Sequence, residues 1–483
     1  MHSSSDIRRA LLGAGLLAAT AAGAFEVWPD YLNVELPSNI APLNFDVRGA
    51  AENAAVRVTL TAPDGDALAA EGREVRFPED AWRAFLGRHA GQPLAGLLRV
   101  GIETLAFTNT VSKFPIDSHL TYRLIPPSYT GFAEVGIYQR DLTSFRERAL
   151  YRNVQDDRKQ CVNCHTYNAG DPKQYLFHTR AHHAGTQIVS ERYGKFKIAP
   201  KLPGGYGGGV YPAWHPSGDF IAFSCNDTSQ LFFTANPDKI EVFDSRSDLF
   251  LYRLSDGQVT MIEQNPLVFE CYPTWSPDGK SLVSVAARVP FRELAATKED
   301  RERAVSDRYT EILYDLVSRT FDPATRTFSS RKILVNAQTS KRSFTFPRVS
   351  PDGRWIVFTV SSHGVFSIWH READLWIMDL RRNEARVLDE LNSNQAESYH
   401  CFSRDGRWMV FSSRRDDGTY TRPYFAAFDP ATGRFAKPFL LPVREPSDHD
   451  RRMLSYNIPE LSAGPVAESA RDLRRLVRGK IRK

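Results

Sequence analysis

The chain has 483 residues, of which 42% are hydrophobic and 12% aromatic, so its composition is that of a folded protein with more than one domain and excludes an intrinsically disordered chain. The formal net charge is +5, but the last thirteen residues alone hold seven basic side chains and one acid. The excess of positive charge therefore belongs to the C-terminus, and the composition gives no basis for nucleic-acid binding.

The first 24 residues are typical of an export signal. Arg8 and Arg9 precede an apolar run over residues 10–24, and this run ends in three small residues before Phe25. The run is too short and too rich in alanine for a typical membrane span, so we predict cleavage after Ala24. The mature protein is then expected to be periplasmic or otherwise exported, and soluble or peripheral. An uncleaved N-terminal anchor is the alternative.

Residues 25–148 contain short runs in which apolar and polar residues alternate, separated by turn residues. Residues 55–60 and 97–102 are two such runs, and the turn Pro63-Asp64-Gly65 follows the first. This pattern predicts an antiparallel β-sandwich of immunoglobulin-like type with one helical turn near residues 80–88. No catalytic set of residues stands out, so we expect a structural or docking domain.

Residues 149–202 contain the motif that organises the rest of the interpretation. Cys161 and Cys164 are separated by two residues, and His165 follows directly. This is the attachment pattern of a c-type haem, because each thiol bonds one vinyl group of the macrocycle and the histidine binds the iron. A zinc site would need a second ligand pair of similar spacing, and a thioredoxin-like dithiol would need a βαβ setting. We therefore predict one covalent haem c, with iron bound by His165.

The same segment is rich in histidine, which bears on the second axial ligand of the iron. His178, His182 and His183 follow the motif closely, whereas no methionine lies nearby. Histidine and methionine are the usual protein ligands at this position. His178 is our first choice, because the intervening residues are numerous enough to return to the far side of a haem. His182, His183, the distant His400 and an open sixth position are the alternatives.

Four similar segments follow one another after a glycine-rich connector at residues 203–209. They lie at residues 211–224, 272–285, 346–358 and 399–411, and each reads as a short strand, a turn such as Ser276-Pro277-Asp278-Gly279 and an apolar strand. Repeats of about four strands at this spacing predict a β-propeller. The extra length between repeats implies insertions, among them a charged, solvated helix within residues 288–307.

These repeats resemble the WD-like repeats of TolB-type periplasmic β-propellers. The resemblance covers roughly residues 205–445 and implies a propeller domain at residues 203–461 with about five or six blades. We expect residues 180–200, joined to residues 445–461, to supply the degenerate blades. The chain as a whole resembles exported bacterial proteins that join a single c-type haem to a TolB-like propeller, and propellers of this type are mostly binding platforms.

One repeat departs from the others at a residue of chemical interest. His400 stands where the other three repeats have Pro212, Pro273 and Pro347. A histidine at this position could face the central channel and the haem, although simple drift of a repeat explains it equally well. Cys225, Cys271 and Cys401 lie outside the haem motif and are compatible with one disulfide or with none.

The last segment, residues 462–483, is a basic tail. Leu473, Leu476 and Val477 could give it one apolar side, so it could contact anionic lipid at a membrane surface or an acidic redox partner. A frayed, solubilising terminus is the alternative.

The chain is therefore expected to be mainly β and to act as an exported c-type cytochrome. It would relay electrons to or from a partner protein, with the propeller as the docking scaffold. A haem-dependent oxidoreductase with its site at the propeller funnel, and a TolB-like binding or assembly module with a structural or sensory haem, are the alternatives. An enzyme would need a pocket lined by groups such as His400, Arg348 and nearby acids.

Overall fold

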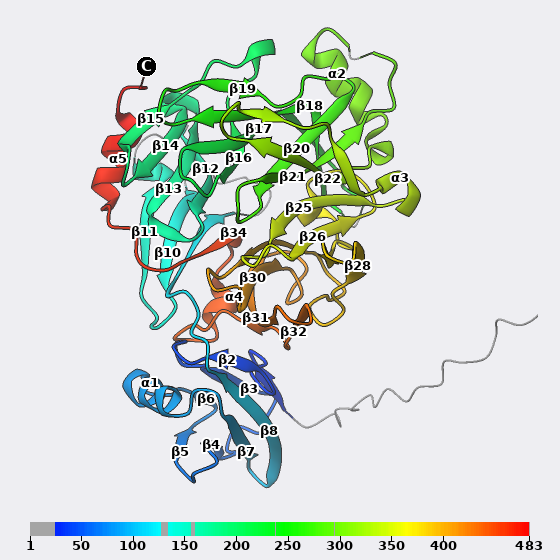
Figure 1. Ribbon diagram of the computed structural model, residues 1–483. Coiled ribbons are helices and arrows are strands. Elements are labelled where there is room, and N and C mark those ends of the chain that lie inside the picture. The colour runs from blue at the N-terminus through cyan, green and yellow to red at the C-terminus, as the bar shows by residue number, and fades with distance from the viewer. Residues whose placement is uncertain (1–24, 127–133, 156–159, 237, 294, 483) are drawn as a thin grey trace, which may run out of the picture.

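The computed structural model describes residues 25–126, 134–155, 160–236, 238–293 and 295–482. A small N-terminal unit lies at one end of the molecule, and a larger set of sheets makes up the rest (Figure 1). The predicted mainly β architecture and the predicted propeller are confirmed, since nearly every sheet outside the N-terminal unit is an antiparallel set of four or five strands. Among the described residues, no helix is long and apolar enough to cross a membrane.

The N-terminal unit is built from two small sheets and one helix. The first sheet has the order β1 (Glu26–Trp28), β3 (Phe45–Arg48) and β6 (Glu74–Val75). The second has the order β2 (Glu35–Pro37), β8 (Glu103–Ser112), β7 (Pro93–Val100), β4 (Val56–Thr61) and β5 (Ala67–Glu71). Helix α1 (Glu79–Arg88) buries Trp82, Phe85 and Leu86. The alternation that predicted these strands is visible in β4, where Val56, Val58 and Leu60 are buried. Whether this unit is of immunoglobulin type stays a prediction.

Six blades are formed by the described residues, within the predicted range of five or six. Blade 1 contains β34 (Ser455–Ser462), β9 (His119–Ile125), β10 (Gly136–Asp141) and β11 (Glu147–Arg152), and blade 2 contains β12 (Cys161–Asn168), β13 (Asp171–Arg180), β14 (Gly185–Ser190) and β15 (Gly194–Ile198). Blade 3 contains β16 (Val210–Trp214), β17 (Phe220–Phe232), β18 (Ile240–Arg253) and β19 (Val259–Met261). Blade 4 contains β20 (Val268–Trp275), β21 (Ser281–Arg288), β22 (Asp315–Asp322), β23 (Thr327–Phe328) and β24 (Lys332–Val335). Blade 5 contains β25 (Ser343–Val349), β26 (Trp355–Ser361), β27 (Asp374–Asp379) and β28 (Glu384–Val387), and blade 6 contains β29 (Glu397–Phe402), β30 (Trp408–Ser413), β31 (Arg422–Asp429), β32 (Arg434–Phe435) and β33 (Phe439–Leu440).

The inner strands of the blades form a closed ring. Each of β12, β16, β20 and β25 contacts the inner strand that follows it in the chain, β29 contacts β34, and β34 contacts β12. Strand β34 is antiparallel to β9, so the C-terminal part of the chain completes a blade that begins at residue 119. The blades stay separate sheets, but the ring packs their inner strands against one another around the centre, which leaves only short, protected inner edges.

The domain boundaries differ from those predicted from the sequence. Strands β9 to β11 were assigned to the sandwich at residues 25–148, and β12 to β15 to a separate haem segment at residues 149–202, but both sets are blades of the propeller. Residues 180–200 and 445–461 do not share a blade. The sequence does not reveal blades 1 and 2 as repeats because both lack the Ser-Pro-Asp-Gly turn. Blade 2 instead uses Ala169 and Gly170, both with positive φ, for the corresponding hairpin.

The short helices occupy connections and the C-terminal segment. Helix α2 (Lys298–Ser306) lies in the charged insertion of blade 4, and α3 (Ala337–Ser340) and α4 (Asp448–Arg451) are single turns. Helix α5 (Ala470–Arg478) packs on the flank of the propeller beside β14 and β15 (Figure 1). Leu473 and Val477 are buried there in a core shared with Tyr175. The apolar side predicted to contact lipid is therefore covered by blades 1 and 2.

The N-terminal unit is attached to the propeller by a shared core and by polar contacts. Trp408 Nε1 on β30 donates to the carbonyl oxygen of Phe114 at 3.1 Å. Asn44 Nδ2 donates to the Arg444 carbonyl oxygen at 2.9 Å, and the guanidinium of Arg76 pairs with Glu445 at 3.0 Å. Residues of both units belong to one hydrophobic cluster, so the unit is a rigid extension of blades 5 and 6.

Closure of the ring by β34 gives a first prediction. A chain that ends after Arg452 lacks β34 and α5, so the inner edge of β9 is exposed and blade 1 cannot close. We expect this chain to aggregate or to lose cooperative thermal unfolding, measured by circular dichroism and gel filtration. A chain that ends after Gly479 keeps both elements and is the control, with a melting temperature within about 4 °C of the full chain. Cooperative unfolding of the shorter chain at an unchanged temperature would contradict the role of β34.

Candidate functional site

All six inner strands share a bulge at the same point. The register with the neighbouring strand shifts there in each blade, and one residue adopts a positive φ. These residues are Cys164, Tyr211, Tyr272, Phe346, Tyr399 and Ile458, with φ values of 42°, 46°, 52°, 51°, 46° and 51°. Four of them are followed by proline, whereas His165 and His400 follow the other two. The Cys161–His165 segment, the predicted haem motif, therefore occupies the repeat position of the propeller at blade 2.

The two thiols of the motif differ in their surroundings. Cys161 at the start of β12 is half-buried, whereas Cys164 is 2% exposed and faces the centre of the ring. Burial raises the pKa of the Cys164 thiol, so it stays protonated at neutral pH. Neither forms a disulfide, and Cys225, Cys271 and Cys401 are also free thiols.

His165 makes a contact between blades. Its Nε2 donates to the carbonyl oxygen of Thr121 on β9 at 3.3 Å, and its Nδ1 is buried without a hydrogen-bond partner. Burial lowers the pKa of His165 to about 4, so the imidazole is neutral. A neutral ring with an unpartnered nitrogen is suitable as a metal ligand.

His400 repeats this arrangement at blade 6. Its Nε2 donates to the carbonyl oxygen of Val357 on β26 at 2.8 Å, and its Nδ1 is also buried without a partner. In both cases the accepting carbonyl belongs to the second strand of the preceding blade. The propeller repeat itself thus explains the burial of His165. Blade 2 differs from blade 6 in its pair of thiols, Cys161 and Cys164.

The space at the centre of the ring is small. Cys164, His165, Tyr211 and Tyr272 line a hollow of about 20 Å³, together with residues of β25 and β34. A hollow of this size holds about one water molecule. A macrocycle attached to the motif therefore has no room inside the channel in this arrangement of side chains.

The histidines predicted as second axial ligand lie on and beside β13. His178 is the cross-strand partner of Asn163, is buried, and forms a hydrogen bond from its Nδ1 to Thr186 Oγ1 at 3.0 Å. Burial and the nearby Arg180 lower the pKa of His178 to about 3. The rings of His182 and His183 are in edge contact at 4.5 Å beyond the end of the strand. The backbone thus brings His178 beside the motif, while His400 is two inner strands away from it around the ring.

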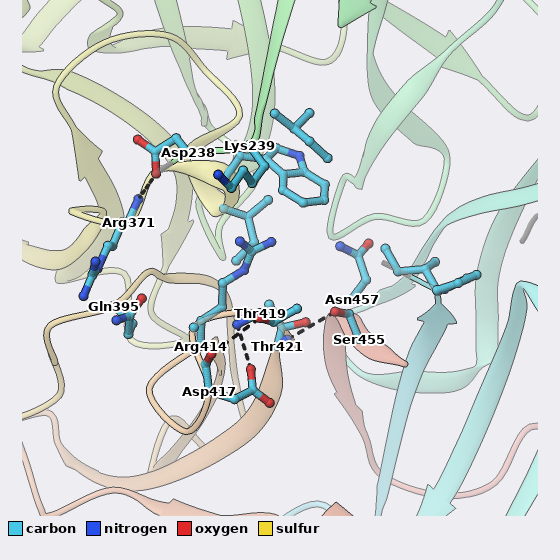
Figure 2. Close-up of a pocket in the computed structure, with 16 residues that line it drawn as sticks. Asp238, Lys239, Arg371, Gln395, Arg414, Asp417, Thr419, Thr421, Ser455 and Asn457 are labelled. Carbon is cyan, nitrogen blue, oxygen red and sulfur yellow. Dashed lines mark hydrogen bonds between the residues drawn. The ribbon is translucent and has the colours of Figure 1, made fainter. Parts of the chain in front are cut away.

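A cavity of about 400 Å³ opens on the face where the inner strands begin (Figure 2). Asp238 and Lys239 lie on one side of it, and Ser455 and Asn457 on the other. Arg123 connects it to the haem motif, because its guanidinium donates to the side-chain oxygens of both Asn163 and Asn457. The volume suits a small ligand, and acidic and basic side chains both line it.

A second cavity of about 360 Å³ lies at the opposite ends of the inner strands. It contains Arg348, as expected from the sequence, together with Glu460, but His400 is not part of its lining. Burial raises the pKa of Glu460 to about 7, and Thr166 Oγ1 donates to its Oε1 at 2.7 Å. Arg348 and His400 both contact the ring of Phe346, but only the arginine lines this cavity, so the two do not share the predicted enzyme pocket.

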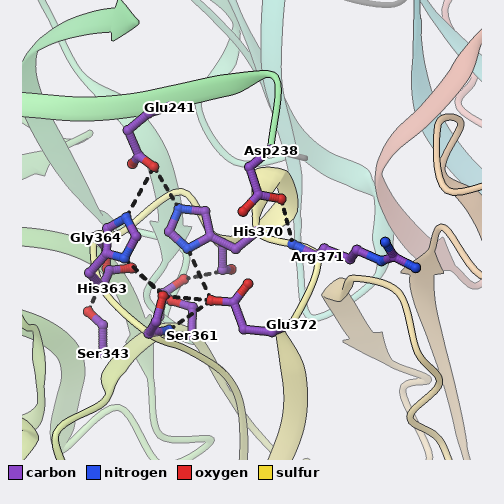
Figure 3. Close-up of polar contacts among 12 residues, drawn as sticks. Asp238, Glu241, Ser343, Ser361, His363, Gly364, His370, Arg371 and Glu372 are labelled. Carbon is purple, nitrogen blue, oxygen red and sulfur yellow. Dashed lines mark hydrogen bonds and ion pairs between the residues drawn. The ribbon is translucent and has the colours of Figure 1, made fainter. Parts of the chain in front are cut away.

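One cluster was missed from the sequence. Glu241, His363 and His370 converge on the face that carries the larger cavity (Figure 3). Glu241 is 122 residues before His363, so no spacing could indicate the set. The only local sign is the pair of histidines seven residues apart in an insertion between two blade strands.

Comparison with known proteins gives similar folds and no family. No family model matches the chain. Dipeptidyl-peptidase 5 of Porphyromonas gingivalis is 20% identical over 187 residues, which is 38% of this chain and 21% of that protein, so the match spans only about a fifth of the relative. Among solved structures, TolB from Acinetobacter baumannii has a TM-score of 0.42 at 13% identity and covers 80% of this chain and 85% of its own. A puromycin hydrolase mutant is also similar, with a TM-score of 0.39 and 13% identity over 68% of this chain and 53% of that chain. An oligogalacturonate lyase in complex with manganese has a TM-score of 0.37 and 13% identity over 67% of this chain and 72% of that chain. The chain is similar to these proteins at TM-scores below 0.5, and its description as a β-propeller rests on its own sheets and closed ring of inner strands.

The burial of His400 gives a second prediction. Burial lowers its pKa in the folded protein to about 3, so between this value and its ordinary value near 6.5 only the unfolded chain binds the proton. The wild-type free energy of unfolding should therefore contain a term that falls as the pH drops below 6.5. His400→Gln keeps a donor near Val357 and removes this term. Between pH 7.5 and 5.0 we expect the wild type to lose about 2 kcal/mol more than the variant in urea unfolding. Equal pH dependence of the two proteins would contradict the assignment.

Proposed function

We propose that the chain is an exported c-type cytochrome in which Cys161 and Cys164 hold one haem covalently and His165 binds its iron. One observation carries the proposal: two unpaired thiols at haem spacing precede a neutral histidine whose Nδ1 has no hydrogen-bond partner. When bound, the haem supplies a one-electron Fe(III)/Fe(II) couple.

The surroundings of the thiols disfavour the other uses of a Cys-x-x-Cys pair. A zinc site or a redox-active dithiol needs a stabilised thiolate, whereas burial raises the pKa of Cys164. Within the described ranges, the only cluster with the geometry of a metal site contains neither cysteine. The motif also lies on a β-strand that pairs with β13, and not in a βαβ unit. Thioether attachment uses the thiols without requiring either setting.

The residues around the motif limit where a haem can lie. The central hollow of about 20 Å³ excludes the channel, so the macrocycle has to lie outside it. Cys161, the half-buried thiol, is at the end of β12 on the same face as the larger cavity. Arg123 and Arg180 are close enough to lower the pKa of the Cys164 thiol, against the larger effect of burial, and their positive charge suits the carboxylates of a haem. His178 remains our proposed second axial ligand.

The rest of the molecule is proposed to act as a scaffold for electron transfer. Propellers present broad faces to partners, and the N-terminal unit, proposed to be of immunoglobulin type, adds a second surface beside blades 5 and 6. Arg471, Arg475 and Lys480 are exposed on the C-terminal segment and suit an acidic redox partner or an anionic membrane surface. Export to the periplasm is part of the proposal, because c-type haem is attached outside the bacterial cytoplasm.

The spectrum of the purified protein tests the proposal. Periplasmic expression in a host that attaches c-type haem should give a pyridine haemochrome of c type with one haem per chain. Cys161→Ala and Cys164→Ala together should remove the covalent haem, and His178→Ala should let the reduced protein bind carbon monoxide readily. Ready binding of carbon monoxide by the wild type would instead favour a catalytic or sensory haem.

His400 supplies a matched control for His165. Both rings are buried between blades with the same hydrogen bond, so His165→Gln and His400→Gln should cost similar stability, each about 1 kcal/mol at pH 7.5. Only His165→Gln should change the Soret band and the spin state of the iron. A wild-type protein without covalent haem, or equal spectral changes in the two variants, would refute the proposed ligand set.

A further inference from the structure

Three ligand atoms meet at the tip of the arm of blade 3, the hairpin formed by the end of β17 and the start of β18. The Oε2 atom of Glu241 lies 3.0 Å from His370 Nε2 and 3.3 Å from His363 Nε2, and all three atoms lie within 4.8 Å of one another (Figure 3). In a tetrahedral zinc site with bonds of about 2.0–2.1 Å, ligand atoms are about 3.3 Å apart. The two distances from Glu241, which are hydrogen bonds in the structure without an ion, are thus already close to the ligand spacing of a site for a small divalent cation.

The cluster is buried and one of its oxygen atoms has no partner. The side chain of Glu241 is 5% exposed and that of His370 is 1% exposed, while His363 at 19% leaves one side open. Glu241 Oε1 is buried and accepts no hydrogen bond. Gly364 keeps the space beside this oxygen clear, because a Cβ atom there would lie 3.3 Å from it. An unpaired buried carboxylate oxygen is costly unless something else binds it.

An oxygen atom lies behind each histidine, at hydrogen-bond distance for His363 and at ion-pair distance for His370, whose Nδ1 has no hydrogen-bond partner. Ser362 Oγ lies 2.9 Å from His363 Nδ1, and Glu372 Oε1 lies 3.8 Å from His370 Nδ1. Ser362 Oγ donates to the same Glu372 carboxylate oxygen at 2.7 Å, so the two supports form one unit. Around metal-bound histidines the second nitrogen is held by a carboxylate, carbonyl or hydroxyl group, and Ser362 does this for His363, while the Glu372 carboxylate is the oxygen nearest in role for His370.

We infer that Glu241, His363 and His370 bind one divalent cation of the zinc type. Two imidazoles and one carboxylate match the ligand preference of Zn²⁺ and leave a fourth position for water on the open side at His363. Glu241 lies near the start of β18, whereas the histidines lie between β26 and β27. The ion would therefore tie blade 3 to blade 5 across blade 4.

The location gives this ion a defined role beside the larger cavity. Asp238 and Lys239, which line that cavity, immediately precede the strand that carries Glu241, and Arg371, next to His370, donates its backbone N–H to Asp238 Oδ1 at 3.2 Å. Fixing Glu241 to the two histidines thus fixes one wall of the cavity. This inference does not depend on the haem.

Metal titration of the full chain tests the inference. After treatment with a chelator and dialysis, we expect the wild type to bind one Zn²⁺ per chain in calorimetry, with zinc and iron counted separately by mass spectrometry. Glu241→Gln and His370→Asn should abolish this binding. Glu372→Gln leaves the three ligands in place and should weaken binding about 10- to 100-fold. Zinc should also raise the melting temperature of the wild type and leave that of Glu241→Gln unchanged.

The exposed pair His182 and His183 provides the control. Their rings also touch, but no carboxylate of the cluster reaches them, so His182→Gln with His183→Gln should bind zinc as the wild type does. The protein with Cys161→Ala and Cys164→Ala should bind it equally, which separates this result from any failure of haem attachment. Failure of the wild type to bind zinc, or retention of tight binding by a folded Glu241→Gln or Glu372→Gln protein, would overturn the inference.

Discussion

The pairing of β34 with β9 is the constraint on which the remainder of the propeller depends. A propeller of separate blades is stable only when every inner strand has a neighbour on both sides, and β34 supplies the last neighbour of β12 and β29. Closure also builds the surroundings of the haem motif from parts of the chain that are far apart in sequence. Arg123 on β9 joins Asn163 on β12 to Asn457 on β34, which is 334 residues away from it. The motif is therefore held at the seam of the ring, where the first and last parts of the propeller meet.

The six-fold repeat separates what is structural in the motif from what is particular to it. A left-handed residue followed by proline or histidine occurs at every inner strand, so the positive φ of Cys164 and the burial of His165 belong to the propeller. The aromatic residue found at four of the equivalent positions is replaced in blade 2 by Cys164, and a second thiol stands three residues earlier. The other five blades pack without a cysteine pair at these positions, so propeller packing does not explain Cys161 and Cys164. They are the part of the motif that calls for a function, whereas the histidine alone does not.

The sequence could predict the repeats that carry strong turns but not the repeats that lack them. Four blades were recognised because a Ser-Pro-Asp-Gly type of turn fixes the hairpin between the first two strands, and the β class followed from the alternation in strands such as β4. Blades 1 and 2 were assigned elsewhere, since their hairpins use other residues and the inner strand of blade 1 comes from the opposite end of the propeller. Similarly, His400 could be singled out because it replaces proline, but the equivalent position of His165 was hidden by the haem motif. The Glu241, His363 and His370 cluster depends on an arm folding over a neighbouring blade, and no local pattern carries that information.

The two faces of the propeller differ in a way that bears on function. The turns of the repeat join the first two strands of blades 3 to 6 at one face, where their geometry is uniform and Gly279, Gly353 and Gly406 adopt nearly the same φ. The opposite face carries the features that depart from the repeat. They are the start of the predicted haem motif, the arm formed by β17 and β18, the insertion that bears His363 and His370, and the cavity lined by Asp238 and Asn457. Loops that depart from a repeat are free to acquire chemistry, because the strands beneath them already secure the fold. Cys161, the cavity and the cluster of Glu241, His363 and His370 therefore share the one face of this propeller on which the chain departs from its own repeat.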